Sequence, residues 1–254
     1  MKITTWNVNS IHARKDMVLD WIERNRADVI LMQETKSTDQ EFPVDDLGDL
    51  GYDAVFTGER SYNGVAICAR DEITGVMKGL PGSEDQKRFI SAVVGGIRFI
   101  SVYVPNGQSL GSDKYAYKLD WLARLVAYLP SFGLPGVPLV MSGDYNIAPF
   151  DVDAWDPKEV SGGTHVSPPE RAAFHALEAL GLTDAYRALN PDTQEFSWWD
   201  YRAGSFQKNM GLRIDIHLLT PEVMKRASRV TIDRVARTKE KASDHAPVTL
   251  ELQA

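Results

Sequence analysis

Three short polar motifs in this sequence lie next to apolar segments of the kind that form buried strands. Gln33–Lys36 follows the apolar run 29–32, Gly143–Asn146 follows 138–142, and Ser243–Pro247 precedes 248–252. An unpaired carboxylate beside a hydrophobic core is costly, so carboxylates at these positions indicate a functional site. The side chains that such a site would combine are three carboxylates, one imidazole and two amides: Glu34, Asp144, Asp244, His245, Asn7 and Asn146. Together these groups could bind a divalent metal ion and catalyse cleavage of a phosphate ester.

The first two motifs suggest different chemical roles. Glu34 ends a fully apolar segment, and a rigid carboxylate there is a hard oxygen ligand that suits Mg²⁺ or Mn²⁺. The alternative is an exposed ion pair between Glu34 and Lys36 at the start of a loop. Asp144 and Asn146 are two residues apart, so in an extended backbone their side chains share one face. They fit a general base whose water is oriented by an amide, and the structural alternative is an Asx turn after Gly143.

The third motif supplies an imidazole. His245 follows Asp244, and a second carboxylate, Asp215, lies in the segment 211–219, which is otherwise apolar apart from Arg213 and His217. A lone carboxylate in such a segment needs a partner, and an Asp215–His245 pair would provide one. Such a pair fixes the imidazole tautomer and favours the cation, which can polarise a phosphoryl oxygen.

The remaining histidines carry weaker signals. His12 lies in an expected loop and His175 on the outer side of an expected helix, so we expect both to be solvated. His217 fits a hydrogen-bonded sheet residue. His165 stands in the Gly-rich segment 161–168, and its role is open between a surface loop and a site residue.

The densest aromatic cluster is Phe196–Arg202, which contains Trp198 and is followed by Lys208 and Asn209. One interpretation is a core strand. The other is a loop that leaves the core, because aromatic rings beside Arg and Lys suit a stacked or extruded nucleotide. We favour contact with a nucleotide, with one of the two tryptophans buried.

Composition sets broad limits. The chain has 254 residues with a net charge of −7, and its single cysteine, Cys68, excludes an intramolecular disulfide. No secretory signal or bilayer-length apolar run is present, so we expect a soluble cytoplasmic protein with one domain over residues 1–254. The negative charge taken alone argues against a nucleic-acid partner. Metal ions offset clustered carboxylates, however, and a local basic rim can act within an acidic protein.

Strand patterns outnumber helix patterns. The expected strands are 2–6, 29–33, 54–57, 64–69, 97–104, 139–142, 212–219, 228–232 and 248–252, and the expected helices are 15–26, 120–129 and 169–180. Several strands follow one another without an intervening helix, which disfavours a doubly wound sheet. The pattern predicts an α/β fold of two mixed sheets packed face to face with helices outside. Loops at the strand ends would then converge on one rim.

Taken together, the motifs resemble the exonuclease III family of DNA-repair nucleases, which includes apurinic/apyrimidinic (AP) endonucleases and belongs to the DNase I-like superfamily. The resemblance covers essentially the whole chain and rests on eight segments: Thr5–Asn9, Gln33–Lys36, Tyr103–Gly107, Tyr117–Trp121, Gly143–Asn146, Phe196–Trp198, Gly211–Asp215 and Ser243–Pro247. It implies a four-layered α/β sandwich, in agreement with the pattern of elements.

The resemblance also implies roles. The metal ligands would be Glu34, Asn7, Asp244 and Asn9, and the catalytic residues Asp144, Asn146, Asp215, His245 and a tyrosine, either Tyr103 or Tyr117. Asp144 would activate the water, Asn146 would position it, and the Asp215–His245 pair would polarise the phosphate. Substrate contacts would come from Lys36, Phe196, Trp198, Arg202, Asn209 and His165, with Phe196–Trp198 lining the pocket for an extrahelical sugar.

The implied activity is Mg²⁺-dependent hydrolysis of duplex DNA, with Mn²⁺ able to substitute. The resemblance implies a monomer that acts on duplex DNA with abasic or 3′-blocked lesions. Its activities in base excision repair would be those of a 3′–5′ exonuclease, a 3′-phosphatase and an AP endonuclease. The alternative on the same fold is a phosphatase or phosphodiesterase for inositol phosphates or sphingolipids, which need a membrane-facing apolar loop or a cluster that binds several phosphates. No exposed apolar hairpin is evident in the sequence.

His165 departs from the family pattern. Many members have a small residue followed by an aromatic one in this loop, whereas here His165 precedes Val166. A bulky polar ring in this loop would obstruct the strand opposite an internal lesion and still admit a 3′ end. The balance between AP incision and 3′-end trimming is therefore open between two alternatives: His165 sets it, or His165 is a surface-loop residue without a role.

Overall fold

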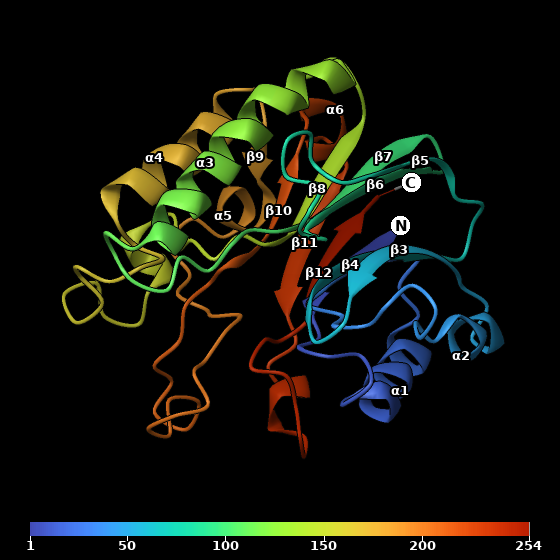
Figure 1. Cartoon of the computed structure of the whole chain (residues 1–254), viewed down its shortest axis with the longest axis horizontal. Helices are drawn as coiled ribbons and strands as arrows, with labels where there is room; N and C mark the ends of the chain where they lie inside the picture. The colour runs from blue at the N-terminus through green and yellow to red at the C-terminus, as the bar shows by residue number, and fades with distance from the viewer. Residues whose placement is uncertain (254) are drawn as a thin grey trace.

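Two six-stranded mixed β-sheets pack face to face in the computed structural model, which describes residues 1–253 (Figure 1). In order, the first sheet contains β11 (Ala227–Ile232), β12 (Val248–Leu252), β1 (Lys2–Asn7), β2 (Val29–Gln33), β4 (Tyr62–Ala69) and β3 (Asp53–Glu59). The second contains β5 (Thr74–Lys78), β6 (Phe89–Val94), β7 (Ile97–Tyr103), β8 (Leu139–Asp144), β10 (Asp215–Leu219) and β9 (Thr183–Asp184). Ala254, the last residue of the expected domain, lies outside the described residues.

The central strands are apolar because both of their faces are covered. Every residue of β2 and β8 is buried, as expected for strands that lie between a second sheet and a layer of helices. Between the sheets, Leu31 and Ile67 of the first belong to the same core cluster as Phe99 and Val140 of the second. This shared core fixes the two sheets against each other.

Helices cover the two outer faces (Figure 1). On the first sheet, α1 (Lys15–Asn25) buries Val18, Trp21 and Ile22, and the short α2 (Val44–Asp49) lies nearby. On the second sheet, α3 (Asp113–Tyr128) and α4 (Pro168–Glu178) bury one apolar side each. The shorter elements are α5 (Ala185–Leu189), α6 (Pro221–Met224) and the 3₁₀ turns η1 (Leu129–Phe132), η2 (Asp151–Asp153) and η3 (Ala236–Thr238). These layers confirm the expected four-layered α/β sandwich.

Most expected elements differ from the structure by one or two residues at their ends, and two begin at a clearly different residue. The helix expected at 120–129 begins at Asp113, because Ser112 caps it by accepting a hydrogen bond from the Tyr115 N–H at 3.1 Å. The strand expected at 212–219 begins only at Asp215, since the preceding residues make no more than isolated bridges at Leu212. The strands β5, β6 and β9 were not predicted, and every residue of β5 is exposed at the edge of its sheet. Among residues 1–253, no helix combines the length and apolar character that crossing a bilayer requires.

Candidate active site

One edge of the sandwich collects the polar ends of six strands. β1, β2, β7 and β8 end there, whereas β10 and β12 run antiparallel to their neighbours and begin there. The side chains at this edge are Asn7, Glu34, Tyr103, Asp144, Asp215 and His245. Residues more than 200 positions apart in the sequence thus meet because sheet pairing brings their strand ends together.

Gly143 allows the last residue of β8 to reach this edge. A Cβ at Gly143 would lie 1.9 Å from the carbonyl oxygen of Val102 on the adjacent strand β7. No side chain fits at that distance, so β7 and β8 can pair beside Asp144 only with glycine at this position. The Gly-Asp sequence is therefore a packing requirement as well as a chemical motif.

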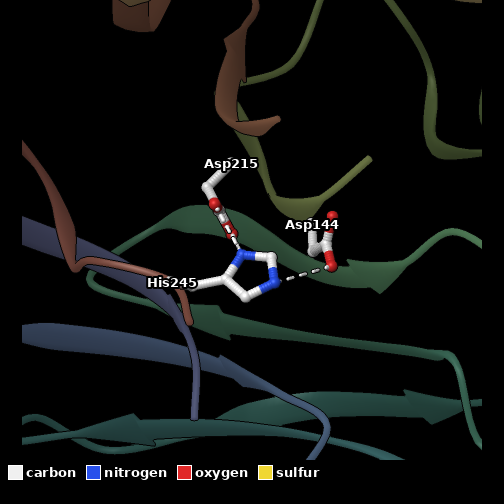
Figure 2. Close-up of side chains that lie close together, drawn as sticks. All are labelled: Asp144, Asp215 and His245. Atoms are coloured by element: carbon white, nitrogen blue, oxygen red, sulfur yellow. Dashed lines mark hydrogen bonds and ion pairs between the residues drawn. The ribbon is translucent and has the colours of Figure 1, made fainter. Parts of the chain in front are cut away.

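His245 lies between two buried carboxylates (Figure 2). Its Nδ1 donates to Asp215 Oδ2 at 2.9 Å, and its Nε2 lies 3.7 Å from Asp144 Oδ2. Burial alone would lower the pKa of His245, but Asp215 and Asp144 outweigh burial and raise that pKa to about 10. The imidazole is therefore protonated at neutral pH, and its Nε2 lies too far from Asp144 for a hydrogen bond, so the Nε2–H is free to donate.

Asp144 is suited to exchange a proton near neutral pH. Its Oδ1 accepts the backbone N–H of Asn146 at 2.9 Å, and its Oδ2 accepts the side-chain amide of Asn7 at 2.9 Å. Burial raises the pKa of Asp144 to about 7, although His245 opposes this shift. A carboxylate with a pKa near 7 can act as a general base at neutral pH.

Glu34 forms a second, anionic half of the site. Its Oε1 accepts from Tyr103 Oη at 2.7 Å and from Asn7 Nδ2 at 3.0 Å, and its Oε2 pairs with Lys36 Nζ at 2.9 Å. Burial would raise the pKa of Glu34, but Lys36 and the hydrogen bonds from Asn7 and Tyr103 outweigh it, so the pKa is lowered. Asn7 donates to both Glu34 and Asp144, so these two carboxylates lie on either side of one amide.

The rim above Glu34 carries the remaining expected metal ligands. Asn9 accepts a hydrogen bond from Lys36 Nζ at 2.6 Å and donates one to Asp244 Oδ1 at 3.0 Å. The other oxygen of Asp244 accepts from Trp198 Nε1 at 3.0 Å. A continuous chain of hydrogen bonds therefore runs from Glu34 through Lys36 and Asn9 to Asp244 and Trp198.

Two groups of side chains could hold a cation. Asp144, Asp215 and His245 are close enough in space to hold a metal ion together. However, Nδ1 of His245 donates to Asp215 and the ring carries a proton at neutral pH, so it has no free lone pair for a metal. Glu34, by contrast, is ionised and already accepts the Lys36 ammonium. An oxygen-rich set around Glu34, with Asn7 and Asp244 nearby, fits a hard cation such as Mg²⁺ better than the histidine group does.

Several site residues have strained backbones. Asn9, Glu34, Lys36, Asn146 and His165 all have positive φ angles, between 44° and 77°. A left-handed conformation of a residue other than glycine costs about 1–3 kcal/mol, and such residues concentrate at active sites. Each of these five residues follows a strand or lies in a tight loop. The left-handed backbone there directs the side chain toward this edge of the sandwich.

His165 lies beside Asn146 and Trp198, and its part in substrate selection stays a prediction. Its Nδ1 is 2.6 Å from the carbonyl oxygen of Asn146, and its ring centroid is 6.1 Å from that of Trp198. A carbonyl only accepts, so Nδ1 carries the hydrogen and Nε2 remains an acceptor. Burial and the nearby Lys118 lower the pKa of His165 to about 4, which keeps the ring neutral.

Of the two candidate tyrosines, only Tyr103 contacts the carboxylates of the site directly, and the choice between them stays a prediction. Tyr103 contacts Glu34 directly, and the guanidinium of Arg88 stacks on its ring at 4.5 Å. Tyr117 lies on α3, hydrogen-bonds to Ser83 at 2.9 Å, and lines a neighbouring cleft of about 390 Å³.

Three of the expected substrate contacts are not brought to the site. Phe196 is buried in a small core cluster with Trp199. Arg202 is exposed and pairs with Asp200, and the exposed Asn209 accepts a hydrogen bond from Trp199 at 3.3 Å. The aromatic segment therefore has two faces. Trp198 contacts the site residue Asp244, whereas Phe196 and Trp199 pack in the core beneath the loop.

The other expected histidines match their sequence interpretations. His217 is buried in β10, where Nε2 donates to the Val248 carbonyl at 3.0 Å and Nδ1 accepts from Ser142 Oγ at 2.6 Å. His12 and His175 are exposed. None of the three contacts the carboxylates of the site.

Sequence reasoning missed a buried ion pair below the site. Lys118 and Glu170 are fully buried and pair with each other, and Lys118 Nζ also donates to the Asn146 carbonyl at 2.7 Å. A lysine one helical turn before the buried Trp121 was a signal that could have been noticed. Ser167 and Glu170 form a capping box, which the Ser-x-x-Glu spacing also signals.

A second missed cluster holds the segment that leads to Asp215. The buried guanidinium of Arg213 pairs with Asp153 at 2.7 Å and with Asp184 at 2.8 Å. The sequence signal was the lone arginine in an apolar segment, which requires buried anionic partners. These partners come from η2 and β9, so the contacts could not be read from local spacing.

The sequence is similar to those of known nucleases. The sequence model of the "Endonuclease/Exonuclease/phosphatase family" matches residues 4–245. The chain is 35% identical to exodeoxyribonuclease III of Haemophilus influenzae, with all of both chains covered. It is 33% identical to the DNA repair nuclease APEX1 of Danio rerio, with 99% of this chain and 82% of that protein covered.

Two solved structures of enzymes that act on DNA have the same fold. The 3′ phosphatase NExo from Neisseria, bound to a product DNA hairpin, is 41% identical and superposes with a TM-score of 0.97 over the full length of both chains. An AP endonuclease from Archaeoglobus fulgidus is 36% identical, also with a TM-score of 0.97 and full coverage of both chains. The arrangement of strands and helices around the site is therefore shared with nucleases that act on DNA.

Proposed function

The chain belongs to the endonuclease/exonuclease/phosphatase family and is a DNA-repair nuclease of the exodeoxyribonuclease III type, and we propose that its main substrates are blocked 3′ ends of duplex DNA. The observation that carries this proposal is the neutral ring of His165 beside Trp198 and Asn146. It narrows the space next to the catalytic residues, which hinders an internal abasic nucleotide more than a frayed 3′ end.

The proposed chemistry divides between the two halves of the site. Asp144, whose pKa is raised toward neutrality, takes a proton from the attacking water. Asn146 holds that carboxylate through its backbone N–H at 2.9 Å and its side-chain amide at 3.3 Å, which fixes the direction of the base. His245, held by Asp215, donates its Nε2–H to a phosphoryl oxygen as negative charge develops there.

Family membership implies metal-dependent catalysis, and we propose Mg²⁺ with Mn²⁺ as a substitute. Glu34 would be the main ligand, with Asn7, Asn9 and Asp244 contacting the ion or its waters. When bound, the ion would polarise the phosphoryl oxygen and stabilise the leaving group. Tyr103, hydrogen-bonded to Glu34, keeps this carboxylate oriented.

Basic clefts beside the site support binding of a DNA backbone despite the net charge of −7. One cleft of about 390 Å³ is lined by Arg88, Lys114 and uncharged residues, with no acidic side chain in its lining. A second, of about 350 Å³, is lined by Arg14, Lys15 and Lys241 together with the acidic Asp16 and Glu240. We propose that the protein acts as a monomer whose clefts contact phosphates on either side of the cleaved bond.

One set of assays tests this proposal. The purified protein is incubated with a 3′-phosphate duplex, an internal abasic duplex and an inositol phosphate, each with Mg²⁺ and with EDTA. We expect Mg²⁺-dependent release of phosphate from the first duplex to exceed incision of the second. Hydrolysis of the inositol phosphate without cleavage of either duplex would instead favour the phosphatase alternative, and activity that persists in EDTA would contradict the metal assignment.

A further inference from the structure

The buried pair of Lys118 and Glu170 connects two parts of the site that the proposed function treats separately. Both side chains are fully buried, and they join α3 to the start of α4. Apolar residues of similar volume would pack two helices as well or better, because two buried charges lose their hydration. A buried pair at this position therefore calls for a role other than helix packing.

The ammonium of Lys118 has three partners. One is Glu170, and the other two are the backbone carbonyls of Asn146 at 2.7 Å and Asn106 at 3.3 Å. The side chains of these two asparagines are themselves hydrogen-bonded at 3.2 Å. Lys118 thus fixes the left-handed backbone of Asn146, whose φ is 50° and whose amide holds the catalytic Asp144.

Glu170 binds the other side of the same network. Its Oε1 accepts the backbone N–H of His165 at 2.9 Å, and its Oε2 accepts the backbone N–H of Ser167 at 3.1 Å. His165 in turn donates from Nδ1 to the Asn146 carbonyl, the oxygen that Lys118 also contacts. The four residues Lys118, Glu170, His165 and Asn146 therefore form a closed ring of hydrogen bonds.

We infer that Lys118 and Glu170 are positioning residues that hold the base-orienting Asn146 and the ring of His165 in one fixed relation. This inference rests on the proposed function of the site. Displacing either charged group would shift the Asn146 amide, which lowers turnover, and would release the loop that carries His165, which relaxes selection between 3′ ends and abasic sites. Both effects arise from one ring of contacts, so they change together.

The test compares three variants, Lys118→Met, Glu170→Gln and the double variant, on the 3′-phosphate and abasic duplexes. In each, we expect kcat on the 3′-phosphate duplex to fall by about 10²-fold with KM within about threefold, because a shift of the order of 1 Å suffices for such a loss. The ratio of abasic incision to 3′-phosphate release should rise by at least about fivefold, the direction expected from freeing His165.

The double variant separates positioning from simple stabilisation. It removes both buried charges, so we expect its melting temperature to recover relative to the single variants, whereas kcat and the substrate ratio stay altered. Recovery of stability together with recovery of kcat and the ratio would overturn the positioning role. Glu170→Gln keeps the shape of the capping side chain, so it gives a folded variant even where Lys118→Met does not.

Leu125→Ala is the matched control. Leu125 is fully buried on α3, seven residues after Lys118, in the core cluster that also receives α4 and that includes none of the four residues of the ring. The substitution should lower the melting temperature and leave the substrate ratio unchanged. A change of ratio in this control equal to that in the test variants would contradict the inference, whereas a wild-type protein that cleaves neither duplex would contradict the proposed function itself.

Discussion

Asp144 and Asp215 are direct cross-strand partners at the end of the antiparallel pair β8–β10, and the ring of His245 lies between them (Figure 2). Like charges opposite each other destabilise a sheet, and burial increases that cost. The protonated imidazole offsets it by contacting both carboxylates. The charge arrangement that stabilises this sheet edge is therefore the one that prepares a base and a cation for catalysis.

The substitution His245→Gln should remove the imidazolium cation and leave Asp144 and Asp215 without a shared positively charged partner. We expect kcat on a 3′-phosphate duplex to fall by about 10³-fold, because one donor to the developing phosphoryl charge is lost. The free energy of unfolding should fall by about 3–5 kcal/mol, because two buried carboxylates lose their shared partner. Urea unfolding and steady-state kinetics measure both. Wild-type stability in this variant would show that His245 does not balance Asp144 and Asp215.

Glu34→Ala should abolish cleavage while the fold stays intact, because Glu34 follows a strand end and is not part of the packed core. Calorimetric titration with Mn²⁺ should show an affinity lowered by more than about 100-fold. The exposed Glu41→Ala serves as the control and should bind Mn²⁺ as the wild type does. Unchanged Mn²⁺ affinity in Glu34→Ala would move the metal to another group of ligands.

His165→Gly should raise abasic-site incision relative to 3′-phosphate release, since it removes the ring next to Trp198. Glycine also accepts the positive φ of 77° at this position, so the backbone loses no conformational stability from the change. The two activities are compared on duplexes of equal length at one Mg²⁺ concentration. An unchanged ratio would show that the ring does not select between substrates.

The stability of the protein should depend on pH through His217. Burial lowers the pKa of His217 to about 4, although its hydrogen bond to Val248 opposes the shift. Between the unfolded pKa of about 6.5 and about 4, only the unfolded state gains this proton, so stability is complete above the upper value and decreases as pH falls. The loss due to His217 should reach about 3 kcal/mol, and His217→Gln should reduce the slope of unfolding free energy against pH over this range, leaving the part due to His165, whose pKa is also lowered to about 4. A parallel curve in the variant would assign the acid sensitivity to other groups.

Local sequence was sufficient for residues that directly follow or precede a core strand. Glu34, Asp144 and His245 were found because a polar residue beside an apolar run has few structural explanations. The same reasoning found Asp215, since a lone carboxylate in an apolar segment needs a partner.

Contacts between distant elements could not be predicted in this way. Lys118 and Glu170 are 52 positions apart, and only the packing of α3 on α4 shows that they meet below Asn146. The contact of Tyr103 with Glu34 likewise depends on strand register, which places Tyr103 opposite Asp144.

The most direct test of the whole account is the Asp144→Asn variant on a 3′-phosphate duplex, measured both for kcat and for equilibrium binding of the duplex with Ca²⁺ in place of Mg²⁺. The substitution keeps the shape of the side chain and leaves one oxygen to accept from Asn7, but it removes the base and the acceptor of the Asn146 N–H. We expect kcat to fall by at least about 10³-fold with the dissociation constant within about threefold of wild type, because the lost interaction belongs to the transition state. A loss of binding as large as the loss of turnover, or near-normal turnover, would contradict the role of Asp144 as the base.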